Sequence, residues 1–191
     1  MMKIRHTTYA CVLAAAALVG GCANPGANLP PLPATAPVPY RLGAEDQLRV
    51  TVFDDTRLSG TFRVSDVGEI SIPLVGRLRA RGLTPEELET ALVNEFSRRD
   101  LISIPAVAVE VQAYRPIFVL GMVERSGQFP FQPGLTVQAA VALAGGFNFR
   151  AVQDTVVVMR AAEGEPAREY RSDRMTLLQP GDVVTVLERW F

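Results

Sequence analysis

The chain has 191 residues, of which 48% are hydrophobic and 20% charged, and its formal net charge is −1. This composition is typical of a globular protein and allows one large domain or two small ones. A nearly neutral chain lacks the basic stripe that nucleic-acid recognition requires. We therefore expect no nucleic-acid partner.

A short apolar run lies near the N-terminus. Lys3 and Arg5 precede the segment YACVLAAAALVG, which has about the length of a signal-peptide core and is too short to span a bilayer comfortably. The run leads into LVGGC, and small residues ahead of a cysteine resemble the lipobox of bacterial lipoproteins, in which the cysteine is acylated and becomes the new N-terminus. We predict a lipoprotein signal peptide over residues 1–21 and lipidation at Cys22. The alternative is an ordinary signal peptide with an unrelated cysteine nearby.

The residues after the cysteine predict a location and a tether. Ala23 is not acidic, which in the lipoprotein pattern favours the outer membrane, and an acyl anchor holds a protein on a membrane without spanning it. We therefore expect a lipid-anchored protein on the periplasmic face of the outer membrane. Residues 23–39 contain six prolines in seventeen positions. Proline-rich chain is extended at about 3.1 Å per residue, so residues 22–39 are predicted to form a tether of up to roughly 50 Å.

Processing at Cys22 removes most of the side chains that carry covalent chemistry. His6 is the only histidine and Lys3 the only lysine, and both precede Cys22, as does Cys11. Nucleophile systems built on His, Cys or Lys, phosphate-binding P-loops and His/Cys zinc sites are therefore excluded. We expect no catalytic residue, no metal site and no cofactor.

Residues 40–114 carry the pattern of one mixed unit. Gln47–Phe53 alternate apolar and polar residues, as in a half-buried strand. Thr84, Pro85 and Glu87 are typical of a helix start, as N-cap, first helical residue and capping-box partner. The predicted buried stripe of this helix is Leu88, Ala91, Leu92 and Phe96, and the predicted water-facing residues are Glu86, Glu89 and Arg99.

Residues 115–191 form a second mixed unit. PIFVLGMV is almost continuously apolar and is expected to be a central strand, and Thr136 begins a helix that Gly145 and Gly146 end. Strands DTVVVMR, REYR and DVVTVLE follow. Two mixed units without a βαβ repeat predict the α+β class. Trp190 and Phe191 are interpreted either as an aromatic pair at a membrane interface or as a packed or subunit-facing end.

The order of these segments resembles a known family. YRLGAEDQLRVTVF, the helix segment and VAVEVQAY together resemble the export domain of the outer-membrane polysaccharide export family. PIFVLGMVERSGQFPFQPGLTVQAAVALAGGF is similar to the adjoining SLBB domain, a β-grasp-like module. The resemblance implies a polysaccharide export domain over 40–114 and an SLBB domain over 115–191.

The resemblance also implies a function. Members are lipid-anchored periplasmic proteins that form homo-oligomeric rings through which capsule or exopolysaccharide leaves the cell, with an inner-membrane polysaccharide co-polymerase as partner. Longer members add a second SLBB domain and a C-terminal helix that lines the pore. Neither follows Phe191 in this sequence. We therefore expect either that a separate outer-membrane β-barrel supplies the route or that the periplasmic ring reaches the membrane only by its acyl chains. The rival interpretation is a monomeric lipoprotein that binds a soluble ligand or cell-wall glycan through its SLBB domain.

Two groups of residues carry a possible chemical role. Glycoside hydrolysis needs two carboxylates at a suitable separation, and the nearby candidates are Asp54, Asp55, Asp66 and Glu69. A position in turns explains these carboxylates with fewer assumptions than catalysis. The aromatic residues that could stack on sugars are mostly expected in the core: Tyr40, Phe53, Phe62, Tyr114, Phe118, Phe129, Phe131, Phe147 and Phe149. Phe147 and Phe149 are the better candidates for exposed inter-subunit contacts.

Overall fold

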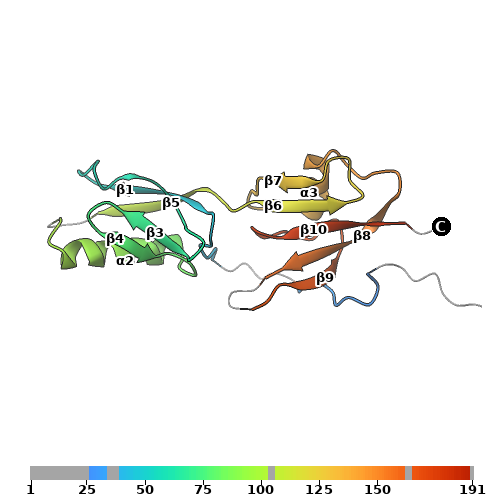
Figure 1. Ribbon diagram of the computed structural model, residues 1–191, viewed down its shortest axis with the longest axis horizontal. Coiled ribbons are helices and arrows are strands. Elements are labelled where there is room, and N and C mark those ends of the chain that lie inside the picture. Colours follow the sequence, from blue (N-terminus) through green and yellow to red (C-terminus); the bar gives the residue numbers. More distant parts are fainter. Residues whose placement is uncertain (1–25, 34–38, 103–105, 162–164, 190–191) are drawn as a thin grey trace, which may run out of the picture.

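The computed structural model describes residues 26–33, 39–102, 106–161 and 165–189. These residues form two units that lie end to end along the long axis of the molecule (Figure 1). The described part of each unit contains one α-helix, its own sheet and its own apolar core. The predicted α+β class is therefore confirmed.

The first unit is built from two small sheets and a helix. Its larger sheet is antiparallel, with the order β2-β1-β5, and a separate hairpin pairs β3 with β4. The bounds are β1 (Gln47–Val52), β2 (Gly60–Arg63), β3 (Glu69–Ile72), β4 (Gly76–Arg79), α2 (Pro85–Arg98) and β5 (Val107–Ala113). In β1, Leu48, Val50 and Val52 are buried while the residues between them are exposed, so the predicted alternation is confirmed.

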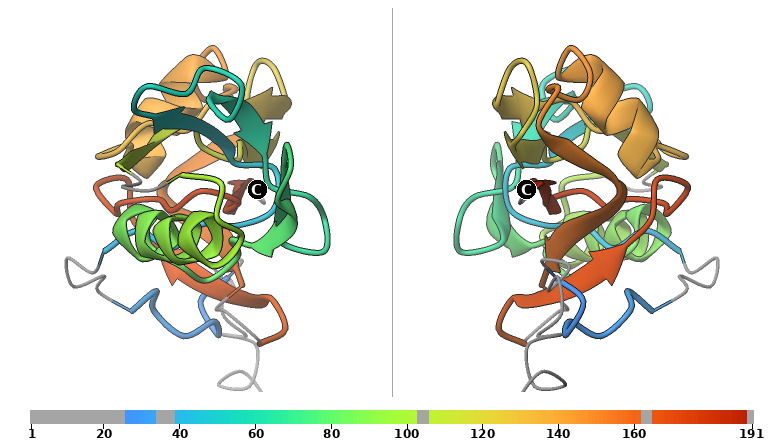
Figure 2. Two further views of the ribbon diagram at one scale, coloured as in Figure 1. Left: turned by 90° about the vertical axis from the view of Figure 1, so that its left-hand side faces the viewer. Right: turned by 90° about the vertical axis from the view of Figure 1, so that its right-hand side faces the viewer.

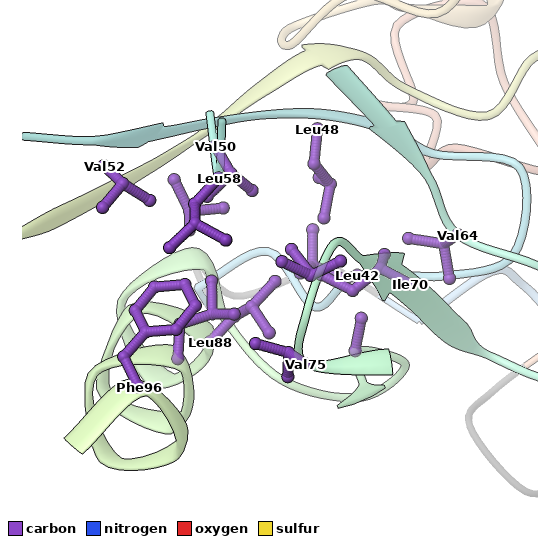
Figure 3. Packing of buried hydrophobic residues seen from close by; sticks show 14 residues of the cluster. Leu42, Leu48, Val50, Val52, Leu58, Val64, Ile70, Val75, Leu88 and Phe96 are labelled. Atoms are coloured by element: carbon purple, nitrogen blue, oxygen red, sulfur yellow. The ribbon is translucent and has the colours of Figure 1, made fainter. Parts of the chain in front are cut away.

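Helix α2 follows the predicted start. The Thr84 side chain accepts a hydrogen bond from the Glu87 backbone N–H, and the Glu87 carboxylate accepts one from the Thr84 N–H at 2.9 Å. Its buried residues Leu88, Leu92 and Phe96 face the sheet, and Figure 3 shows Leu88 and Phe96 directed into the core.

The prediction that Glu89 faces water is wrong. Its carboxylate accepts a hydrogen bond from the Val109 N–H of β5 at 2.8 Å. β5 pairs with β1 along one of its sides, and α2 packs against it. A carboxylate on the helix can therefore satisfy a strand N–H that has no sheet partner.

The second unit contains a five-stranded mixed sheet. Its order is β7-β6-β10-β8-β9, in which β10 is parallel to β6 and antiparallel to β8. The bounds are β6 (Ile117–Gly121), β7 (Gly127–Phe129), α3 (Val137–Leu143), β8 (Ala151–Arg160), β9 (Arg168–Ser172) and β10 (Val183–Glu188). The last strand, β10, is therefore the central one, and the prediction that the PIFVLGMV strand is central is wrong.

The apolar run of β6 has another origin. Helix α3 covers one face of the sheet, where Val119, Val184 and Val186 are buried. Phe118 and Leu120 point to the opposite face and are 39% and 40% exposed. The sequence of β6 is thus apolar on both faces, but only one face is buried. The pattern of apolar residues alone does not show that the other face is exposed.

The predicted tether is not a free spacer throughout. Leu32 N–H donates to the carbonyl of Arg171 at 2.9 Å, and Arg171 N–H donates to the carbonyl of Pro30 at 2.8 Å. This short segment therefore extends the sheet beyond β9, as Figures 1 and 2 show for the blue chain beside β9. A proline-rich segment can pair at a sheet edge because an edge strand needs hydrogen bonds on only one side, so the missing N–H of proline can face away from the sheet.

A substitution at Gly121 tests the packing of β6 against β10. Gly121 has φ +84°, and a Cβ there would lie 2.1 Å from the Val186 carbonyl oxygen. We expect Gly121→Ala to lower the free energy of unfolding by more than about 3 kcal/mol, measured by urea denaturation. Gly134→Ala is the matched control, because Gly134 has φ +85° with no atom within 4 Å. It should cost only about 1–2 kcal/mol, and equal losses would contradict the predicted clash.

Candidate functional site

The four carboxylates considered for catalysis are accounted for by turns and ion pairs. Asp55 binds the guanidinium of Arg57 at 2.7 Å, and this hydrogen bond holds the pKa of the Asp55 carboxyl below its usual value. Glu69 lies 3.8 Å from Arg77 across the β3–β4 hairpin. Asp66 Oδ1 accepts the next backbone N–H, and Asp54 has a positive φ of 58° in the loop after β1. Among the described residues, no contact brings any two of these four carboxylates together as a catalytic pair.

The described residues also offer no metal site or membrane span. No group of three or more His, Cys, Asp or Glu side chains among them is placed to hold a metal ion. Neither of their helices is long and apolar enough to cross a bilayer. Cys22, Trp190 and Phe191 lie outside the described residues, so their predicted roles stay predictions.

The most elaborate polar arrangement lies where the two units meet. Asp46, in the turn that precedes β1, is fully buried. Its Oδ2 accepts hydrogen bonds from the Gly43 N–H at 2.7 Å and the Tyr40 hydroxyl at 2.6 Å, and its Oδ1 accepts one from the Arg115 N–H at 2.8 Å. Three donors therefore satisfy this buried carboxylate, one of which comes from the chain that enters the second unit.

The Arg115 side chain extends the same network into the second unit. Its Nε donates to the Pro180 carbonyl at 3.0 Å, and its Nη1 donates to the Tyr40 hydroxyl at 3.0 Å. The guanidinium lies 5.8 Å from the centre of the Tyr40 ring, in the geometry of a cation–π contact. A Cβ at Gly43 would lie 2.0 Å from Nη1, so this close passage requires glycine.

Aromatic rings cross the same boundary. The rings of Tyr40 and Tyr114 meet edge to face at 4.9 Å, and those of Tyr114 and Phe131 at 5.6 Å. Phe131 packs against the core of the second unit and Tyr40 against that of the first. Burial, together with the Asp46 hydrogen bond, raises the pKa of Tyr40, so its hydroxyl stays a donor. We call Tyr40, Asp46, Tyr114, Arg115 and Phe131 the joint.

A second buried aspartate faces the joint from the other side. Asp182, in the turn before β10, is 1% exposed and binds Arg160 at 2.6 Å. Its Oδ2 also accepts the Gln179 N–H at 2.7 Å, three residues earlier, as Asp46 accepts the Gly43 N–H. Its carbonyl accepts the N–H of Phe118 at 3.0 Å. The connection between the units is therefore held by two turns of the same construction.

Sequence reasoning missed these residues. Asp46, Arg115, Arg160 and Asp182 were not singled out, although each aspartate stands directly before an alternating apolar strand. An aspartate at that place commonly accepts the backbone N–H of its own turn. This repeated position is a signal that the sequence does contain. Nothing local indicates that Arg115 reaches both turns.

Five of the nine aromatic residues expected mostly in the core pack against the two cores, and three are exposed: Tyr40, Phe62, Phe129, Phe131 and Phe147 pack against a core, and Phe53, Phe118 and Phe149 are exposed. All nine are half-buried or exposed, and Phe96 is the aromatic side chain that is fully buried in the described part of the chain. Of the two residues favoured for exposed contacts, Phe147 packs against the second core, whereas Phe149 is 87% exposed. The aromatic residues therefore lie mainly at the margins of the two cores, with Phe149 fully outside them.

The exposed face of the five-stranded sheet is apolar. The strand register aligns Phe118 and Met159 on either side of Val183, so these three side chains form a row across β6, β10 and β8. Phe118 and Met159 are 39% and 37% exposed. No described helix covers this row, which is a surface suited to contact with another molecule.

Two family models match the chain. The polysaccharide biosynthesis/export protein model matches residues 34–112, and the SLBB domain model matches residues 116–169. The interval between the two matches contains Tyr114 and Arg115 of the joint. The two matched segments follow one another in the order that the sequence resemblance implied.

Two curated relatives have related descriptions. The chain is 37% identical over 123 residues to the exopolysaccharide production protein ExoF of Rhizobium meliloti (strain 1021), which covers 57% of this chain and 28% of ExoF. It is 28% identical over 184 residues to the EPS I polysaccharide export outer membrane protein EpsA of Ralstonia solanacearum, covering 79% of this chain and 48% of EpsA. The chain thus spans less than half the length of each relative.

Removing the Asp46 charge tests the joint. Asp46→Asn leaves one acceptor oxygen for three donors, so at least one buried donor loses its partner. We expect the free energy of unfolding to fall by about 2–4 kcal/mol in urea denaturation. Glu45→Gln is the neighbouring control, because Glu45 forms only an exposed ion pair with Arg63 and should change stability by less than about 0.5 kcal/mol. Similar losses in both variants would contradict the role of the joint.

The raised pKa of Tyr40 predicts a particular alkaline behaviour. Because the folded state favours the protonated hydroxyl, its stabilisation is complete below the unfolded tyrosine pKa of about 10 and is lost as pH rises toward the higher folded value. Folded protein at about pH 11 should therefore show the same phenolate absorbance with or without Tyr40→Phe. One additional phenolate in the unsubstituted protein would show that Tyr40 ionises normally.

Proposed function

Because the chain belongs to the polysaccharide biosynthesis/export family, we propose that it is the periplasmic component of an outer-membrane polysaccharide export conduit. It carries capsule polysaccharide or exopolysaccharide out of the cell as a ring-shaped homo-oligomer. Acylated Cys22 holds it on the periplasmic face of the outer membrane. An inner-membrane polysaccharide co-polymerase supplies the polymer, and a separate outer-membrane protein is a further predicted partner.

The observation that carries the proposal is the pair of matched domains in succession, an export domain and then an SLBB domain. Family membership assigns the chain to transport, so the prediction that it is not an enzyme is confirmed. The chemistry of the processed chain agrees with a passive role, because it has neither histidine nor lysine. The conduit adds no covalent step to the polymer.

The joint supports a role in a ring. Subunits that assemble head to tail around an axis must keep a constant shape for the ring to close. A buried carboxylate with three donors and an arginine shared between the units limit relative motion of the two units. The exposed row of Phe118, Val183 and Met159 supplies apolar area for contact between subunits.

The surface chemistry suits a hydrated polymer. The chain is close to neutral as a whole, and several of its exposed carboxylates are paired with arginine, as in Arg41–Glu87 and Arg63–Glu45. Such a surface makes weak, exchangeable contacts with a polysaccharide. Weak contacts allow a polymer to slide, whereas tight subsites would retain it.

Loss of the protein should block export while synthesis continues. Deleting the gene in its own bacterium is expected to abolish surface polysaccharide and to leave polymer inside the cell envelope, measured by immunoblotting of surface and cell fractions. Restoring the gene should restore surface polymer. Normal surface polymer in the deletion strain would contradict the export role.

The mass of the purified protein separates the proposal from its rival. Acylated protein in detergent is expected to sediment as an oligomer of several subunits in analytical ultracentrifugation. A stable monomer at high protein concentration would favour the rival, a lipoprotein that binds a soluble ligand or cell-wall glycan through its SLBB domain.

Lipidation is tested by Cys22→Ser. The thiol that receives the lipid is removed, so the variant should move from the membrane fraction to the soluble periplasmic fraction. Cys11→Ser is the control, because Cys11 lies within the predicted signal peptide. Unchanged membrane association of Cys22→Ser would refute the anchor.

A further inference from the structure

We propose that the end of the second unit remote from the joint is a membrane-contacting surface, which places Phe149 in the interfacial layer of a phospholipid bilayer. We call this surface the distal end. The inference rests on the proposed lipid anchor at Cys22 and adds to it the orientation of the folded protein on the membrane. Its evidence is the convergence of four segments, their exposed side chains and the path of the N-terminal chain.

Four segments converge at the distal end. The Asn148 N–H donates to the Met122 carbonyl at 3.0 Å, and the Arg125 N–H donates to the Ala144 carbonyl at 2.8 Å. The Arg189 N–H donates to the Arg150 carbonyl at 2.8 Å. These bonds join the loop after β6, the end of α3, the loop before β8 and the end of β10 into one surface, which Figure 1 shows opposite the first unit.

The distal end exposes apolar side chains. Phe149 is 87% exposed, and no other large hydrophobic residue of the described chain is as exposed. Leu143, at the end of α3, is 42% exposed, and Leu120, near the end of β6, is 40% exposed. A single exposed hydrophobic residue is ordinary on a soluble protein. Exposure alone therefore gives no indication of what this surface meets.

That indication comes from the N-terminal segment. Gly26 lies against the outer face of the sheet: a Cβ at this position would be 3.2 Å from Leu187 Cδ1 and 3.5 Å from Val157 Cγ2. Leu187 is the penultimate residue of β10, so the described chain begins beside the distal end. Cys22 is four residues upstream, and four residues span at most about 14 Å. The acyl chains of Cys22 would therefore enter a bilayer close to this surface.

The charges of the distal end also suit a phospholipid surface. Its four segments contain three arginines and two carboxylates. The arginines are Arg125, Arg150 and Arg189, and the carboxylates are Glu124 and Glu188. Arg150 pairs with Glu188 at 2.5 Å, and Arg125 donates to the Leu143 carbonyl at 3.1 Å. Arginine binds lipid phosphates, and aromatic residues are favoured at the level of the headgroups.

The opposite end of the molecule provides a contrast. Phe53 is 70% exposed in the loop after β1, but Asp54 and Asp55 follow it directly. Carboxylates beside an aromatic residue disfavour contact with anionic headgroups. Phe53 therefore serves as a matched control, with the same residue type and a similar exposure.

The processed chain allows a clean labelling experiment. Acylation consumes the thiol of Cys22, and Cys11 is removed with the signal peptide, so an introduced cysteine is the only free thiol. Phe149→Cys and Phe53→Cys are purified in acylated form, labelled with an environment-sensitive fluorophore and reconstituted in vesicles of phosphatidylethanolamine and phosphatidylglycerol. Flotation measures vesicle binding, and brominated lipids measure the contact of each label with the bilayer.

We expect the label at position 149 to shift its emission to the blue and to be quenched several-fold more strongly than the label at position 53. Protein that floats with the vesicles while the label at position 149 stays in water would overturn the membrane contact and leave the anchor intact. A label at position 149 that is equally shielded from water in the non-acylated Cys22→Ser background, without lipid or detergent, would identify a subunit contact instead and would also overturn the proposal. Acylated protein that does not float would refute the anchor, and with it both the proposed location and this surface.

Discussion

The arrangement of the molecule depends on one buried carboxylate. Asp46 accepts hydrogen bonds from Gly43, Tyr40 and Arg115, and so binds the first strand of one unit to the chain that opens the other. A buried carboxylate without partners is costly, so the three donors must stay in place together. The Arg115 side chain then reaches Pro180 and carries the constraint into the second unit. The two units are therefore connected by direct hydrogen bonds as well as by the chain that links them.

The joint leaves specific surfaces for partners. In the second unit, α3 covers one face of the sheet, whereas the Phe118, Val183 and Met159 row and the distal end have no described element over them. The proposed subunit contact along the row and the proposed bilayer contact at the distal end use different parts of this surface. Both roles are compatible with one rigid subunit, since the row lies beside the joint and Phe149 lies at the other end of the sheet. Under the proposed lipid anchoring at Cys22, the joint sets how far the first unit stands from the membrane.

Sequence-based predictions are correct where the interacting residues are close in the chain, and wrong where the partner lies on a distant element. The capping box of Thr84 and Glu87 is correct because its partners are three residues apart. The alternation of β1 is correct because burial of one sheet face imposes a period of two. The central position assigned to PIFVLGMV is wrong, because a strand with two apolar faces looks the same whether the second face is buried or exposed. Glu89 was misplaced because its partner, the Val109 N–H, belongs to a strand whose position α2 does not encode.

The sequence by itself determined the two α+β units, the helix termini, the order of the matched domains and the absence of histidine and lysine after residue 6. These properties depend on residue type, on spacing of a few residues and on the order of segments in the chain. Only the tertiary structure decided the joint, the pairing of residues 30–32 with β9 and the place of Phe149 at the distal end. Asp46 and Arg115 are 69 residues apart, and such contacts form only when whole elements pack, so no local pattern reports them.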